Sequence, residues 1–199
     1  MISSLRAVCV LIALALTAMP PAIAQTVGDK KIDQALRQEL LKRLEDDQRV
    51  RLNPTLAGEM HAIDNANLAR VKEVIAKHGW PGKSLVDTDG AAAFFMLVHH
   101  AAWQTDKPSY QAEVLPLMRR AVEKDEASAV DLAYLIDRVN VFERKPQIYG
   151  TQPGHPIDNE AEVDQRRKLV GLPTLSEHDA MVKAFLKNRA EQKNEPDKK

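Results

Sequence analysis

The stretch GAAAFFMLVHHAAWQ, residues 90–104, decides the fold because it is apolar on almost every side. A helix of this kind has no face suited to water and belongs at the centre of a helical domain. We therefore predict a buried central helix with other helices packed around it.

Helical periodicity continues before this segment. Isoleucine and leucine recur every four residues in residues 30–51, and a second apolar stripe runs through residues 59–78. Gly79 and Pro81 provide the end signals of that second helix. The N-terminal half thus predicts two helices that can flank the central one.

After the central segment, helices are predicted from about residue 108 and over residues 126–141. Pro116 should kink or interrupt the first of these. No segment alternates apolar and polar residues as a half-buried strand does. We predict an all-α fold, a single compact domain of five to seven helices with one long ordered polar loop.

That loop is residues 145–158, KPQIYGTQPGHPID, with three prolines, two glycines and no helical period. Long ordered loops in compact domains are often functional.

Two helix starts are predicted beyond the loop. Asn159 with Glu162 suggests a capping box for a short helix that Gly171 ends. Ser176 with Asp179 suggests a similar start for the last helix.

The N-terminal sequence has the order of a secretory signal peptide. Arg6 precedes an apolar run of about a dozen residues, and a small-x-small motif ends at Ala24. The run is too short to span a bilayer, which needs about 20 residues. We expect cleavage after Ala24, export to the periplasm or the medium, and no stable membrane insertion afterwards. The predicted organisation is signal peptide 1–24, helical domain 25–186 and a charged, disordered tail 187–199.

Composition narrows the function classes. Cleavage would remove Cys9, the only cysteine, so the mature chain has neither a disulfide nor a thiol nucleophile. The 28 basic residues balance 28 acidic ones, and loss of Arg6 with the signal leaves a net charge of −1. A nearly neutral chain argues against nucleic-acid binding by bulk charge. No glycine-rich phosphate loop or nucleophile elbow is present, and we expect no cofactor.

His99 and His100 are the first candidates for chemistry. Adjacent helical residues point about 100° apart, so only one of the two is expected to reach a given site. His100 is the candidate general acid or base. A metal site is the alternative, because His61 and Asp64 lie one turn apart and could converge on His99, as in a metal-dependent hydrolase that also uses Asp137. A histidine hydrogen-bonded inside the core is the third possibility.

Asp137 and Arg138 are the second feature. Tyr134 lies within the same turn, and Asp131 shares a face with Arg138 at i, i+7. A surface ion pair there would contribute little. An arginine covered by the following loop would instead hold that loop in place or contact an anion.

The loop offers uncharged donors and acceptors in Gln147, Tyr149 and Gln152, which suit recognition of a polar ligand. Equally, these side chains can pin the loop to the body. We expect at least one of Arg166 and Arg167 to pair with a carboxylate, and we place Arg167 among the ligand-binding candidates.

Several segments together resemble an uncharacterised bacterial family classed as a domain of unknown function. They are DDQRVR (46–51), GWP (79–81), LVHHAA (97–102), AYLIDRV (133–139), QIYGTQ (147–152) and RRKLVGL (166–172). The resemblance spans about residues 40–175 and implies a shared fold. In that family a glutamine more often precedes the histidine, so His100 matches the family position and His99 departs from it. The family brings no established activity.

The leading hypothesis is a pocket for a small polar or anionic ligand under the loop, formed with His100, Asp137 and Arg138. A metal-dependent hydrolase and a non-catalytic interaction module are the alternatives. The ligand, the oligomeric state and the protein partners do not follow from the sequence.

Overall fold

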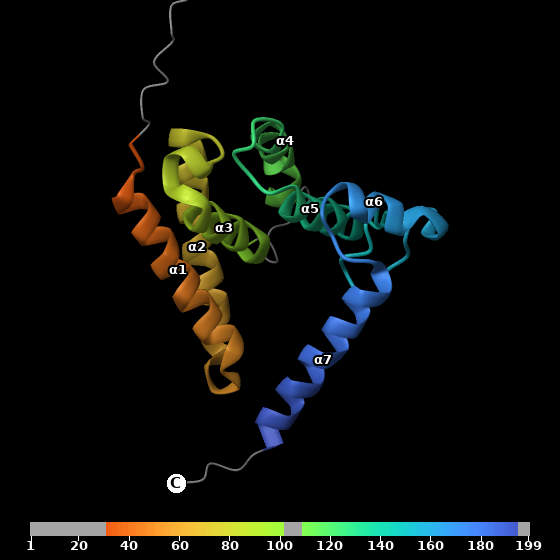
Figure 1. Ribbon diagram of the computed structural model, residues 1–199. Helices are drawn as coiled ribbons and strands as arrows, with labels where there is room; N and C mark the ends of the chain where they lie inside the picture. The colour runs from red at the N-terminus through yellow and green to blue at the C-terminus, as the bar shows by residue number, and fades with distance from the viewer. Residues whose placement is uncertain (1–30, 102–108, 195–199) are drawn as a thin grey trace, which may run out of the picture.

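The computed structural model describes residues 31–101 and 109–194, and this part of the chain is helical (Figure 1). Two short 3-10 helices, η1 (Pro54–Glu59) and η3 (Glu160–Glu162), accompany seven α-helices within those ranges. Only an isolated bridge between Gln147 and Ile157 is strand-like among the described residues. The predicted all-α class is confirmed. The α-helices are α1 (Gln34–Leu52), α2 (Met60–His78), α3 (Lys83–Ala101), α4 (Tyr110–Glu123), α5 (Ala129–Phe142), α6 (Val163–Leu169) and α7 (Leu175–Asn194).

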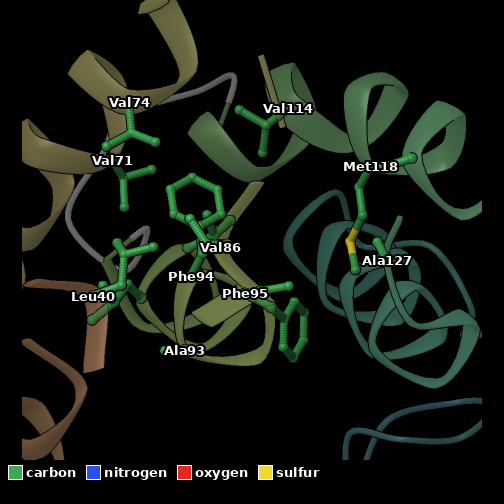
Figure 2. Packing of buried hydrophobic residues seen from close by; sticks show 14 of the residues in the cluster. Leu40, Val71, Val74, Val86, Ala93, Phe94, Phe95, Val114, Met118 and Ala127 are labelled. Carbon is green, nitrogen blue, oxygen red and sulfur yellow. The ribbon is translucent and has the colours of Figure 1, made fainter. Parts of the chain in front are cut away.

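The central helix is α3, as its apolar sequence predicts. It packs against α1 and α2 on one side, and its residues Phe94, Leu97 and Val98 are almost completely buried. Figure 2 shows Phe95 lying between Phe94 and Met118 of α4. One continuous core therefore joins the N-terminal helices to the C-terminal half of the domain.

Helix α3 begins earlier than the sequence predicts. Its first turn starts at Lys83, and Asp87, with φ 62° and ψ 174°, breaks the helical backbone before the apolar segment starts. The apolar pattern could not reveal this turn, because its sequence KSLVD is mostly polar. The predicted end at residue 104 lies outside the described residues.

Helix α4 runs without interruption through Pro116, so the predicted break is absent. The proline lies on the exposed face of the helix. There the carbonyl group that loses its partner can turn towards water. Ser109 caps this helix by accepting a hydrogen bond from the backbone N–H of Ala112.

The C-terminal helices start from caps other than those predicted. Asn159 has a left-handed backbone and makes no capping hydrogen bond, so the predicted box with Glu162 is absent. Gly171, with φ 83°, does follow the end of α6. The start of α7 is a reciprocal pair instead: Glu177 accepts from the N–H of Thr174, and Thr174 Oγ1 accepts from the N–H of Glu177.

Helix α7 continues to Asn194, well past the tail boundary predicted at residue 187. Figure 1 shows it leaving the other helices from its contact with α6. Within the described ranges, no helix combines the length and apolar character needed to cross a bilayer. The predicted signal peptide lies outside the described residues.

Candidate functional site

A buried carboxylate orients the ring of His100 near the end of α3. Asp47 on α1 is fully buried, and its Oδ2 lies 2.7 Å from Nδ1 of His100. A carboxylate only accepts, so Nδ1 carries a proton, and Nε2 is the ring atom at which a second proton can be held or released. The described part of the chain offers no hydrogen-bond partner to that Nε2. His100 is thereby prepared to accept a proton at a defined atom.

Arg51 is the third member of this group. It follows Asp47 by one helical turn, and its Nε donates to Oδ1 of Asp47 at 3.1 Å. Its Nη2 binds Asp64 on α2. Nε also lies 3.0 Å from Nδ1 of His100, but one Nδ1 cannot donate to Asp47 and accept from Arg51 at once. The shorter contact with Asp47 assigns the proton to Nδ1, and Arg51 then bridges two carboxylates on two helices.

The two carboxyl groups respond differently to this setting. Burial would raise the pKa of Asp47, but hydrogen bonds from His100 and Arg51 outweigh it, and the pKa is lowered. Burial raises the pKa of Asp64, and the charge of Asp47 adds to this against the opposing charge of Arg51. The lowered pKa keeps Asp47 ionised to a lower pH than an ordinary aspartate.

His99 contacts Arg138 on α5, whereas His100 contacts Asp47 on α1. Its Nε2 lies 3.0 Å from Nη1 of the arginine, and because a guanidinium only donates, the imidazole must accept and be neutral. Burial first, then the charges of Arg138, His100 and Arg51, lower the pKa of His99 to about 3. The Nδ1 atom of His99 is buried and finds no hydrogen-bond partner among the described residues.

Arg138 links the histidines to the polar loop (residues 145–158). Its Nη1 lies 3.5 Å from Oε1 of Gln152. Burial lowers the pKa of Arg138 to about 10, and the charge of Arg51 contributes to the shift. The ring centroids of His99 and His100 are 5.7 Å apart. A single polar cluster thus runs from α1 through the end of α3 to α5 and the loop.

Asp137 does not pair with its neighbour Arg138; it organises the loop. Its Oδ1 accepts from the backbone N–H of Ile148 at 2.7 Å and of Tyr149 at 3.0 Å. Its Oδ2 accepts from the N–H and the hydroxyl of Thr151 at 2.9 and 3.0 Å. The carboxylate is fully buried, and these hydrogen bonds replace its hydration.

Gln147, within the loop, and Arg167, on α6, also hold the loop in place by hydrogen bonds to its backbone. The Gln147 amide donates to the carbonyl of Gln152 and accepts from the N–H of that residue. Arg167 is fully buried and donates to the carbonyls of Tyr149 and Pro173.

The neighbouring Arg166 also binds carbonyl groups, those of Ile148 and Asp158. The prediction that Arg166 or Arg167 pairs with a carboxylate is therefore wrong within the described residues. Backbone carbonyl groups of the loop and of the segment after α6 accept the hydrogen bonds of these two guanidinium groups instead.

The predicted site residues accordingly separate into two groups. His100, Arg138 and Gln152 belong to the polar cluster, together with His99. The side chains of Asp137, Gln147 and Arg167 are engaged in holding the loop, and Tyr149 takes part through its backbone.

The residues of the alternative metal site are arranged differently. Asp64 is bound to Arg51, and His61 is exposed on α2. The described residues contain no group of three or more histidine, cysteine or acidic side chains placed to hold a metal ion.

Sequence reasoning missed Asp47 and Arg51 as site residues. A signal was present: Asp47 falls on the stripe that buries Leu36, Leu40 and Val50 of α1. An aspartate at a core position of an amphipathic helix needs a partner, because a buried unpaired charge is costly.

A comparison with family models assigns the chain to a protein family. The chain belongs to a family of unknown function, DUF6624, whose model matches residues 22–187. The resemblance drawn from the sequence segments is confirmed at the level of the family. No curated protein and no solved structure matches the chain.

Proposed function

We propose that this is an exported protein that binds a small anionic ligand beside His100 and uses His100 as a general acid or base. The observation that carries the proposal is the fixed ring of His100, with Nδ1 bound to Asp47 and Nε2 available, next to the guanidinium of Arg51. Arg138 on α5 places a second guanidinium group in the cluster, where it contacts His99.

Two guanidinium groups in the cluster support an anion, although Arg51 is already bound to the carboxylates of Asp47 and Asp64. Arg51 lies close enough to Arg138 for its charge to lower the pKa of that guanidinium. His99, the residue between them, is neutral and cannot offset either charge. A carboxylate or phosphate group reaching both arginines would relieve this repulsion, and guanidinium groups match such anions in a two-pronged geometry.

The Asp47–His100 pair supports proton transfer. When Nε2 accepts a proton from a ligand or a water molecule, the ring becomes an imidazolium whose Nδ1–H already points at a buried carboxylate. The same pairing orients the general base in hydrolases that use a histidine and an aspartate. The loop contributes Gln152, whose Oε1 lies 3.5 Å from Nη1 of Arg138 and whose amide offers a neutral acceptor and donor.

Calorimetric titration of the mature protein with inorganic phosphate, acetate and citrate tests the binding step. We expect at least one of these anions to bind, and the substitution Arg138→Gln to weaken it by about tenfold or more, the loss of one charge-assisted contact. Arg119→Gln is the matched control, since Arg119 is exposed on α4. Failure of all three anions to bind, or equal binding by Arg138→Gln, would contradict the proposal.

The role of His100 is tested separately. His100→Gln should keep anion binding within a few-fold of the original protein and remove any proton transfer to or from the bound ligand, read out as the dependence of the calorimetric heat on the ionisation enthalpy of the buffer. A loss of melting temperature with unchanged binding and an unchanged buffer dependence would assign His100 a structural role, as in a non-catalytic interaction module.

A further inference from the structure

A hollow lies at the junction of α3, α4 and α5, away from the polar loop. Its volume is about 70 Å³. The wall is mostly apolar and includes Trp80, Phe95, Met118 and Ala127. Phe95 separates this hollow from the histidines, because its ring centroid is 5.4 Å from that of His99.

One carboxyl group stands in the apolar wall, that of Asp131 in the first turn of α5. No group in the described part of the chain donates a hydrogen bond to it. Burial alone raises its pKa to about 6. Lys83 also lines the hollow, but its ammonium is bound to Asp125 at 2.8 Å.

Helix capping does not account for this carboxyl group. Ser128 already caps α5, accepting from the N–H of Asp131 at 3.2 Å. The reciprocal hydrogen bond, from the N–H of Ser128 to the Asp131 carboxyl, is absent from these described residues. A carboxyl group in an apolar wall without a donor is costly unless something binds it.

We propose that this hollow is a second binding site, for a small primary amine whose apolar body fills the hollow and whose ammonium group pairs with Asp131. The aromatic and aliphatic wall supplies the burial of the apolar body. The ammonium group supplies the hydrogen-bond donors that residues 31–101 and 109–194 do not give to this carboxyl group. Trp80 and Phe95 add ring faces, against which a cation is stabilised.

The hollow and the polar cluster lie along the same helix, α5. Asp131, Tyr134 and Arg138 fall on one stripe of α5, so the two sites lie about two turns apart on the same helix. Tyr134 stands between them, with its ring centroid 6.5 Å from that of His99. The hollow and the polar cluster have opposite charge preferences and are separate in their lining residues.

Calorimetry with benzylammonium, and with uncharged benzyl alcohol as its neutral counterpart, tests the proposal. Asp131→Asn keeps the shape of the side chain and removes its charge. We expect it to weaken benzylammonium binding by about tenfold or more and to leave the binding of benzyl alcohol within about twofold. Asp158→Asn is the control, the same chemical change at an exposed loop position.

Carbon-13 NMR of the Asp131 carboxyl gives a readout that does not depend on a variant. Saturating benzylammonium should lower the pKa of Asp131 from about 6 towards the ordinary aspartate range. No binding by the original protein, or an Asp131 pKa that does not move on binding, would overturn the assignment. Arg138→Gln should leave amine binding unchanged, so this proposal and the anion site fail or succeed separately.

Discussion

Nε2 of His99 accepts a hydrogen bond from Nη1 of Arg138 at 3.0 Å, and this contact joins the end of α3 to α5. It also requires a neutral imidazole, because the arginine can only donate. A glutamine side chain could serve the same purpose, since its Oε1 is a neutral acceptor at a similar reach.

The neutral state of His99 makes folding stability depend on pH. The folded pKa of His99, about 3, lies below the ordinary histidine value of 6.5. As the pH falls below 6.5, the unfolded chain gains a proton at this residue and the folded chain does not, so stability decreases. We expect His99→Gln to remove on the order of 3 kcal/mol of this decrease between pH 6.5 and about pH 4. Urea unfolding at a series of pH values measures the effect.

The control for this prediction is His155→Gln, at an exposed position of the loop. It should leave the pH profile unchanged. An equally steep profile in His99→Gln would contradict the buried neutral state of His99. His178, whose pKa is also lowered by burial, contributes in the same direction in every variant.

Asp47→Asn should destabilise the fold and free the ring of His100. The variant leaves Arg51 with one carboxylate fewer, and breaking a buried ion pair costs about 3–5 kcal/mol. Denaturant unfolding measures the loss, and nitrogen-15 shifts of the imidazole report whether Nδ1 keeps its proton. Because the pKa of Asp47 is lowered in the folded state, its contribution to stability is present above the ordinary aspartate value of 3.8 and is lost as the pH falls through the folded pKa.

Asp46→Asn is the matched control at the adjacent position. Asp46 is partly exposed and pairs with Lys42 at 3.3 Å, so its loss should cost less than about 1 kcal/mol. Similar costs for the two variants would show that the Asp47–His100 contact is not special.

Gly150→Ala should destabilise the loop by about 1–3 kcal/mol. Gly150 has φ 66°, and a Cβ atom there would come within 2.6 Å of Cδ1 of Ile157. Gly58→Ala is the comparison, because nothing lies within 4 Å of its added Cβ atom. Thermal unfolding of the two variants distinguishes them, and equal melting temperatures would contradict the left-handed, tightly packed geometry at Gly150.

The mature protein should begin at Gln25. Expression of the full chain in a bacterial host with a secretory pathway, followed by mass spectrometry of the exported product, measures its mass. We expect the loss of residues 1–24. Ala24→Arg should block cleavage and retain the full mass, whereas a product of full mass from the original sequence would contradict the prediction.

Much of the helical framework was predictable because apolar periodicity is a local property of the chain. The segment from Ala91 to Val98 is apolar on all sides and does form the central helix. Helix starts were less predictable, since several residues near each start can serve as a cap. Thr174, rather than Ser176, caps α7 because its hydroxyl and N–H both meet Glu177.

The polar cluster was predictable only in part, because its partners are far apart in sequence. Asp47 and His100 are separated by 53 positions, and no local pattern encodes that pairing. His100 and Arg138 could be selected as polar residues on otherwise apolar helices. Asp137 could be selected on the same ground, but its use by the backbone of the loop depends on how that loop folds back.

The carboxylate of Asp137 has a consequence for how the C-terminal part of the domain opens. It binds the N–H groups of Ile148, Tyr149 and Thr151, and Arg166 and Arg167 tie the same loop to α6. We therefore expect the loop and α6 to open together as one cooperative unit. Amide exchange across residues 147–169 should then follow a single opening event.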